Sequence, residues 1–157
     1  VNSVSVSRFE REVKMTSQLR HPNTIEIYDY GVVGRDTYYY VMEFVDGITL
    51  QELIERFGPQ PPSRVIHLLR QICGSLSEAH QLGMIHRDIK PANILLTAQA
   101  GLYDMVKVLD FGLVREVDPE AAERTQSLGI TGTPMYMSPE SVRDAAKANE
   151  QSDLYST

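Results

Sequence analysis

Oxygen-bearing side chains and a lysine lie in two short segments in the second half of the chain. The first segment, residues 86–93, reads His-Arg-Asp-Ile-Lys-Pro-Ala-Asn and contains Asp88, Lys90 and Asn93. The second begins with Asp110, which follows a short apolar run. Carboxylate and amide oxygens are ligands that suit Mg²⁺, and the lysine would neutralise an anionic group. This combination indicates phosphoryl transfer, in which positioning and charge stabilisation do most of the catalytic work.

The same segments resemble the signature motifs of protein kinases. Residues 86–93 resemble the catalytic loop, Asp-Phe-Gly at 110–112 the metal-binding motif, and Ser-Pro-Glu at 138–140 the end of the activation segment. Each motif is weak alone, but the three occur in the family's order, and Asn93 stands five residues after Asp88. The resemblance covers essentially the whole chain, which looks most like the bacterial, eukaryotic-like serine/threonine branch.

This resemblance implies an α+β, two-lobed fold that is truncated at both ends, with a partial N-lobe and a partial, mainly helical C-lobe. The chain would be one incomplete kinase domain, with residues 1–42 in the N-lobe, 43–47 in the hinge and 48–157 in the C-lobe. Residues 110–140 would form the activation segment. The sequence contains no Gly-rich loop and no lysine before Glu12, and we expect both features upstream of Val1.

The resemblance assigns roles to the residues on the phosphate side of the site. Asp88 would accept the proton of a substrate hydroxyl, and Lys90 would contact the γ-phosphate of ATP and favour serine/threonine over tyrosine substrates. Asn93 and Asp110 would hold Mg²⁺. Glu12 would form an ion pair with the nucleotide-binding lysine that the sequence lacks. We therefore expect that this chain alone has no measurable kinase activity.

Other residues would bind the adenine. Met42 matches the gatekeeper position, the backbone groups of Glu43 and Val45 would hydrogen-bond the base, and Leu95 would pack on its face. Four further positions match the family's regulatory spine, in which Phe111 would pack behind the site: Thr16, Ile27, His86 and Phe111. We interpret His86 as a packed core residue and His21, His67 and His80 as structural or solvent-facing.

The activation segment suggests regulation by phosphorylation, including self-phosphorylation. Arg87 and Arg115 would bind a phosphate through charge-assisted hydrogen bonds and order the segment. The candidate phosphosites are Thr125, Ser127 and Thr131, whereas Thr133 matches the position that shapes the substrate site.

Two further features lie towards the end of the chain. Residues 152–156 resemble the start of a buried helix that anchors the catalytic loop, and Glu140 lacks the downstream arginine of the family.

Two classes of function remain open. The first is an ATP- and Mg²⁺-dependent protein kinase that acts on Ser/Thr hydroxyls of protein substrates. The second is a naturally truncated, non-catalytic interaction module with a kinase-like sequence. The retention of Asp88, Lys90, Asn93 and Asp110 favours the enzyme, because a chain without catalysis has no chemical reason to keep all four.

The elements that must position these residues follow from local patterns. Residues 8–20 are predicted to form a helix that ends at His21-Pro22, followed by a β-hairpin of residues 24–33 and 37–45, a turn at Asp46-Gly47 and a helix at 50–57. The strongest apolar face, with Val65, Leu68, Leu69, Ile72, Leu76 and Ala79, predicts a helix over 63–82 that stops at Gly83. Short strands are expected at 93–96 and 106–109, with residues 97–104 inserted as a surface turn.

Composition excludes other classes of protein. The 157 residues carry a formal charge of −6, which argues against non-specific nucleic-acid binding. A single cysteine, Cys73, excludes an intrachain disulfide, indicates a reducing compartment and is expected to be a buried structural thiol. No apolar run is long enough to span a bilayer. We expect a cytoplasmic location, and a membrane anchor outside this segment remains compatible with the sequence.

Overall fold

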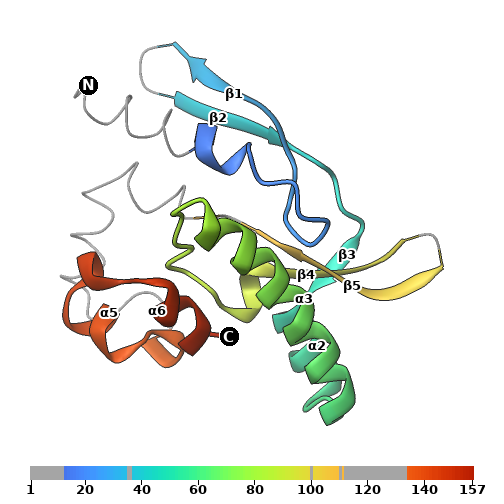
Figure 1. Cartoon of the computed structure of the whole chain (residues 1–157). Helices are drawn as coiled ribbons and strands as arrows, with labels where there is room; N and C mark the ends of the chain where they lie inside the picture. Colours follow the sequence, from blue (N-terminus) through green and yellow to red (C-terminus); the bar gives the residue numbers. More distant parts are fainter. Residues whose placement is uncertain (1–12, 35–36, 100, 110, 112–133) are drawn as a thin grey trace.

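The computed structural model describes residues 13–34, 37–99, 101–109, 111 and 134–157. Figure 1 shows the β1–β2 hairpin at one end of the molecule and α2, α5 and α6 at the other. The described helices and strands are, in chain order, β1 (Ile27–Val33), β2 (Thr37–Met42), β3 (Gly47–Thr49), α2 (Leu50–Phe57), α3 (Pro62–Gln81), β4 (Ile94–Gln99), β5 (Leu102–Val108), α5 (Pro139–Arg143) and α6 (Glu150–Tyr155). Short 3₁₀ turns occur at η1 (Pro91–Asn93), η2 (Pro134–Tyr136) and η3 (Ala145–Lys147).

The first described residues form a helical turn that packs on the β1–β2 hairpin. Residues 13–16 are helical, and buried Val13 and Ile27 form a small cluster with three half-buried tyrosines, Tyr30, Tyr38 and Tyr40. The predicted antiparallel hairpin is confirmed, although its strands, 27–33 and 37–42, are shorter than the predicted 24–33 and 37–45. The predicted helix over 8–20 is wrong at its end, because the backbone N–H groups of Arg20 and His21 donate to the Glu78 carboxylate instead of continuing the helix. Its beginning lies outside the described residues.

A second, three-stranded antiparallel sheet has the order β3–β4–β5. Gly47, which the sequence places in a turn, begins strand β3. A Cβ atom at this position would collide with the carbonyl oxygen of Leu96, so glycine allows the close approach of the two strands. The linker between β2 and β3, residues 43–46, joins the two sheets.

Strands β4 and β5 are longer than expected. The sequence places residues 97–104 in a surface turn, but most of them continue the ladder, and the turn between the strands contains Gly101 with φ +81°. Arg64 of α3 donates from Nε and Nη2 to the Asp104 carboxylate at 2.9 and 2.6 Å. This bidentate ion pair holds the β4–β5 hairpin against α3. The local sequence pattern did not reveal this contact.

The helix predictions for α2 and α3 are confirmed within one or two residues at their ends. Helix α2 has the predicted bounds, and Gly83, with φ +73°, follows α3 as expected. The buried face of α3 begins at Leu68, and Val65, which the sequence places on that face, is exposed. Cys73 is also exposed, which corrects the expectation of a buried thiol. It lies on the outer face of α3.

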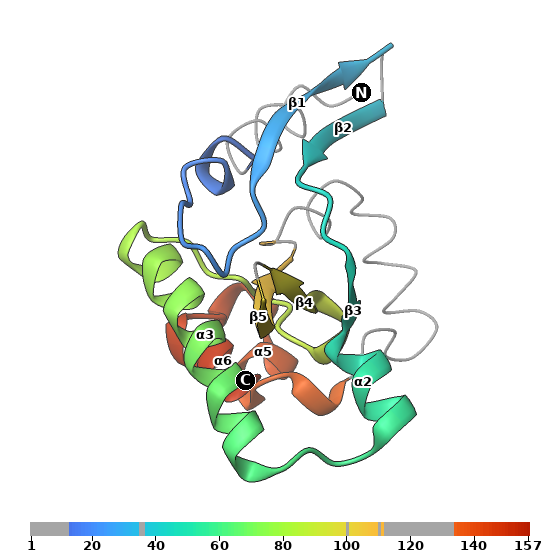
Figure 2. The same ribbon diagram turned by 90° about the vertical axis from the view of Figure 1, so that its right-hand side faces the viewer.

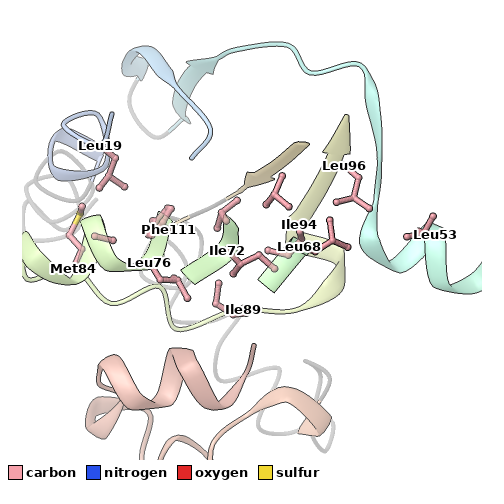
Figure 3. Packing of buried hydrophobic residues seen from close by; sticks show 13 residues of the cluster. Leu19, Leu53, Leu68, Ile72, Leu76, Met84, Ile89, Ile94, Leu96 and Phe111 are labelled. Atoms are coloured by element: carbon pink, nitrogen blue, oxygen red, sulfur yellow. The ribbon is translucent and has the colours of Figure 1, made fainter. Parts of the chain in front are cut away.

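The main core lies between α3 and the β3–β4–β5 sheet. Figure 2 shows α3 along one side of β4 and β5. Figure 3 shows the apolar side chains of this core, with Ile72, Leu76 and Ile94 close together. The buried side chains of this core include Ile72 and Leu76 of α3, Ile94 of β4, Val106 of β5 and Phe111. No helix among the described residues is long and apolar enough to cross a membrane.

Candidate active site

Asp88, Lys90 and Asn93 meet in the loop between α3 and β4. Lys90 Nζ lies 2.8 Å from Asp88 Oδ2. The Asn93 amide nitrogen donates to the same carboxylate oxygen at 3.1 Å and to the Asp88 carbonyl oxygen at 2.8 Å. All three residues are half-buried. Four residues of the sequence indicate phosphoryl transfer, and the structure brings three of them together. The fourth, Asp110, lies outside the described residues.

Backbone hydrogen bonds hold this loop in place on both sides of Asn93. The Asn93 N–H donates to the Lys90 carbonyl within the turn η1, and Asn93 O accepts from the N–H of Leu109, directly after β5. The turn begins with Pro91, whose fixed φ suits the first position of a helical turn. Asn93 is thus fixed between the start of β4 and the end of β5, the strand that leads to Asp110.

A buried aspartate of α6 binds the other end of the loop. Asp153, 1% exposed, accepts the backbone N–H groups of His86 and Arg87 at 2.8 Å each. Arg87 has φ 67°, a left-handed conformation that is uncommon for a residue with a side chain and costs about 1 kcal/mol or more. The hydrogen bonds to Asp153 stabilise this conformation. The resemblance of residues 152–156 to an anchoring helix is consistent with this arrangement, although the sequence analysis did not single out Asp153.

His80 of α3 is the third donor to Asp153. Its Nε2 atom lies 2.8 Å from Asp153 Oδ2, and its side chain is 11% exposed. The sequence analysis gave His80 only as structural or solvent-facing. Its contact is to a residue 73 positions away in the chain, so no local signal in the sequence could have found it.

His86 lies beneath the loop as a core residue, as predicted. It is 0% exposed, and its ring lies against that of Phe111, tilted by 55° with 4.7 Å between centroids. Its Nδ1 accepts the N–H of Asp88, so Nε2 carries the proton and donates to the Leu109 carbonyl at 2.7 Å. With both ring nitrogens occupied by the backbone, His86 orients the loop and is not arranged to act as a base.

The residues expected to bind adenine lie around the linker 43–46. Met42 at the end of β2 is 43% exposed, whereas Glu43, Val45 and Leu95 are half-buried. The Glu43 side chain makes an ion pair of 2.6 Å with Lys107 of β5, a contact that the sequence analysis did not find. The adenine-binding roles stay predictions.

Several expected site residues fall outside the described residues. These are Glu12, Asp110, Arg115, Thr125, Ser127, Thr131 and Thr133. Of the remaining regulatory positions, Arg87 is exposed, and Thr16 and Ile27 are buried. The regulatory contacts of the activation segment therefore stay predictions.

A pocket beside Asp88 lies between the catalytic loop and the end of the chain. Its lining comes from the loop, from the end of η2 and the two residues after it, from α5, and from α6 and the residue after it: Arg87, Asp88, Ile89, Lys90, Tyr136, Met137, Ser138, Ser141, Ser152, Asp153 and Ser156. The sequence analysis did not identify Tyr136 or Met137.

Glu140 of α5 forms a hydrogen bond with α6. The Ser152 hydroxyl donates to Glu140 Oε1 at 2.6 Å. This hydrogen bond holds the pKa of Glu140 below its ordinary value of 4.5. It joins α5 to α6 and hence to Asp153, which fixes the loop.

The described part of the loop offers one oxygen of a type that suits a hard divalent cation. With its amide nitrogen turned to Asp88, Asn93 offers its amide oxygen, and carboxylate and amide oxygens suit Mg²⁺. Within the part of the chain that the structure describes, no three His, Cys, Asp or Glu side chains form a metal-binding group. A magnesium site at Asn93 stays a prediction.

The chain is similar to known proteins over nearly its whole length. The family model described as protein kinase domain matches residues 2–157. The chain is 39% identical over 153 residues to the serine/threonine-protein kinase pkn3 of Myxococcus xanthus, covering 96% of the chain and 28% of that protein. It is also 39% identical over 152 residues to the serine/threonine-protein kinase PknB of Mycobacterium tuberculosis, covering 95% of the chain and 24% of that protein. It thus spans about a quarter of the length of these curated relatives.

Solved structures show the same likeness. The PknI kinase domain of Mycobacterium tuberculosis superposes with a TM-score of 0.69 at 28% identity, covering 99% of this chain and 55% of that one. The structure of Rad53 in complex with AMP-PNP gives a TM-score of 0.72 at 28% identity, covering 94% of this chain and 34% of that one. These matches confirm the partial, α+β kinase-like fold expected from the sequence.

Proposed function

Since the chain belongs to the protein kinase domain family, we propose that it carries the catalytic loop of a protein serine/threonine kinase that uses ATP and Mg²⁺. Nucleotide and metal use are general in this family. The observation that carries the proposal is the Asp88–Lys90–Asn93 cluster, which the backbone and Asp153 hold in a fixed loop. Such fixed charges suit a reaction that depends on positioning more than on covalent catalysis.

Asp88 orients the nucleophile in this proposal. Its Oδ2 atom is engaged by Lys90 and Asn93, so we assign Oδ1 to the hydroxyl of a Ser or Thr side chain in the substrate. The hydroxyl oxygen forms the new bond to the γ-phosphorus of ATP, the bond from that phosphorus to the β–γ bridging oxygen breaks, and Asp88 accepts the hydroxyl proton. Lys90 neutralises charge on the transferred group.

Asn93 and Asp110 would hold Mg²⁺, which supplies positive charge to the phosphate oxygens when bound. On the other side of the site, the backbone of Glu43 and Val45 would bind adenine. Met42 would limit the depth of the site, and Leu95 would pack on the base.

We further propose that the chain divides into an N-lobe up to residue 42 and a C-lobe from residue 48.

Regulation would act through the activation segment. Arg87, exposed and next to Asp88, would join Arg115 in binding a phosphate on Thr125, Ser127 or Thr131, and self-phosphorylation would supply that phosphate. Thr133 would contact the catalytic loop. We place this activity in the cytoplasm, where ATP is available.

The proposal is tested by γ-phosphate transfer. The natural gene product is isolated with an antibody to this segment and incubated with Mg²⁺, ATP labelled at the γ-phosphate and a general protein substrate. The expected product is labelled phosphoserine or phosphothreonine, and chelation of Mg²⁺ abolishes it. Absence of label in protein, or label in phosphotyrosine alone, would contradict the proposal.

A further inference from the structure

Glu43 and Lys107 form an ion pair where the linker 43–46 passes the three-stranded sheet. Lys107 Nζ lies 2.6 Å from Glu43 Oε1, and the two side chains are only 14% and 19% exposed. The partners are 64 residues apart in the chain, one next to β2 and the other in β5. The pair therefore connects the hairpin end of the molecule to the three-stranded sheet.

The Glu43 end of this pair is fixed by backbone hydrogen bonds. Glu43 N–H donates to the Glu26 carbonyl at 2.9 Å, and the Glu26 N–H donates to the Glu43 carboxylate, also at 2.9 Å. Residue 43 thus keeps its position relative to the segment that enters β1. Its own backbone, and that of Val45 two residues later, are the groups assigned to adenine.

The Lys107 end is fixed relative to the catalytic loop. Lys107 lies in β5 opposite Leu95 of β4. Two residues further on, the Leu109 N–H donates to the carbonyl of Asn93 and the Leu109 carbonyl accepts from His86. A short, hydrogen-bonded path therefore runs from Lys107 to the residues assigned to metal and phosphate.

We propose that Lys107 is a positioning residue that sets the distance between the adenine-binding linker and the phosphate-binding loop. This inference rests on the proposed function. ATP must contact both ends at once, and a ligand held at two sites gains affinity only when the sites are correctly spaced. Adenosine has no phosphates, so in the proposed site it contacts the linker and Leu95 but not the phosphate-binding loop, and its binding depends less on that spacing.

The experiment compares variants of the natural gene product in steady-state kinetics with ATP, using adenosine as a competitive inhibitor. Lys107→Met keeps the aliphatic side chain and removes the charge, and we expect it to raise KM for ATP about fivefold, or about 1 kcal/mol. We expect kcat and the inhibition constant of adenosine to change less than about twofold. Lys147→Met, at an exposed lysine in η3, is the matched control and leaves KM unchanged.

A second variant separates the ion pair from general damage to the fold. Glu43→Gln is expected to raise KM for ATP in the same way, and the double variant is expected to be no worse than either single one, because both remove the same interaction. An unchanged KM in Lys107→Met, equal weakening of ATP and adenosine, or additive effects in the double variant would overturn the inference. Failure of the unmodified protein to bind ATP would instead contradict the proposed function.

Discussion

Asp88 and Asp153 show how the environment gives two aspartates different tasks. The Asp88 side chain is 33% exposed and borders the pocket, whereas Asp153 is 1% exposed and accepts N–H groups from three residues. A carboxylate that several buried donors bind is a structural acceptor, because its removal leaves those donors unsatisfied. In the proposed reaction Asp88 meets the substrate hydroxyl, whereas Asp153 holds the backbone of the two preceding residues.

The role of Asp153 predicts the effect of its amide variant. In Asp153→Asn, one oxygen still accepts a backbone N–H, but the amide nitrogen faces a second donor. We expect the free energy of unfolding to fall by about 2–4 kcal/mol, measured by denaturant unfolding, with faster hydrogen exchange at residues 86–88. The control is Glu150→Gln in the same helix, at an exposed position. Equal unfolding curves for the two variants would contradict the role of Asp153.

Asn93 predicts a metal-dependent effect. Asn93→Ala removes the amide oxygen assigned to Mg²⁺ and the hydrogen bonds to Asp88. We expect the Mg²⁺ concentration needed for half-maximal phosphoryl transfer to rise about tenfold or more, the size of effect typical of changes around a metal ligand. Mg²⁺ titration of the transfer rate measures it, and an unchanged midpoint would exclude Asn93 as a ligand.

At the level of residues, the sequence placed in one site residues that are close together in the chain. Asp88, Lys90 and Asn93 lie close together in sequence, and the structure brings their side chains together. The Glu43–Lys107 pair and the hydrogen bonds to Asp153 join distant segments, and no pattern in a single sequence specifies such partners.

Both ends of α2 have local causes, which explains why this helix was predicted correctly. Thr49 and Glu52 form a capping box at its start, and Gly58, with φ +69°, ends it. Strands β4 and β5 were predicted too short because their extension depends on pairing and on the ion pair between Arg64 and Asp104. Strand bounds set by tertiary contacts are not encoded in the local pattern.

The capping box predicts a pH dependence for α2. The backbone N–H of Thr49, and then its hydroxyl, donate to the Glu52 carboxylate and hold its pKa below 4.5. A lowered folded-state pKa contributes stability above the unfolded-state value, and this contribution is lost as pH falls through the folded-state value. The stability advantage over Glu52→Gln is therefore expected at pH 7 and should disappear at pH values well below 4.5.

Unfolding of the two proteins in denaturant at several pH values measures this difference. Glu55→Gln, at an exposed position of the same helix, is the control for loss of one negative charge. An advantage of Glu52 over glutamine that persists unchanged in acid would contradict the capping role of the carboxylate.

At the scale of the whole molecule, one polar face of α3 joins the hairpin end to the core. Two side chains of α3 bind the segment that precedes β1. Gln71 accepts a hydrogen bond from the Asn23 side chain, and Glu78 accepts hydrogen bonds from the backbone N–H groups of Arg20 and His21. Thr24 shares a buried hydrogen bond of 2.7 Å with Ser75, which lies between Gln71 and Glu78 on the helix. This face, together with the Glu43–Lys107 pair, fixes the orientation of the two parts.

A variant of Gln71 tests this connection between α3 and the segment that precedes β1. Its Oε1 atom accepts from Asn23 Nδ2 and Val106 N–H, and its Nε2 atom donates to the Asp104 carbonyl. Gln71→Ala removes these hydrogen bonds and is expected to lower the free energy of unfolding by about 2–3 kcal/mol. Arg70→Ala, at the neighbouring exposed position, is the control. A similar loss of unfolding free energy in both variants would contradict the role of Gln71 in this connection.

The central claim is that Asp88 orients the hydroxyl that receives the phosphate. Its most direct test is the single-turnover rate of γ-phosphate transfer at saturating ATP and Mg²⁺, measured for the natural gene product and for its Asp88→Asn variant. We expect the rate to fall about 10²–10⁴-fold, with ATP affinity nearly unchanged, while Asp144→Asn at an exposed site transfers at the unmodified rate. Transfer by Asp88→Asn at the rate of the unmodified protein would contradict the claim.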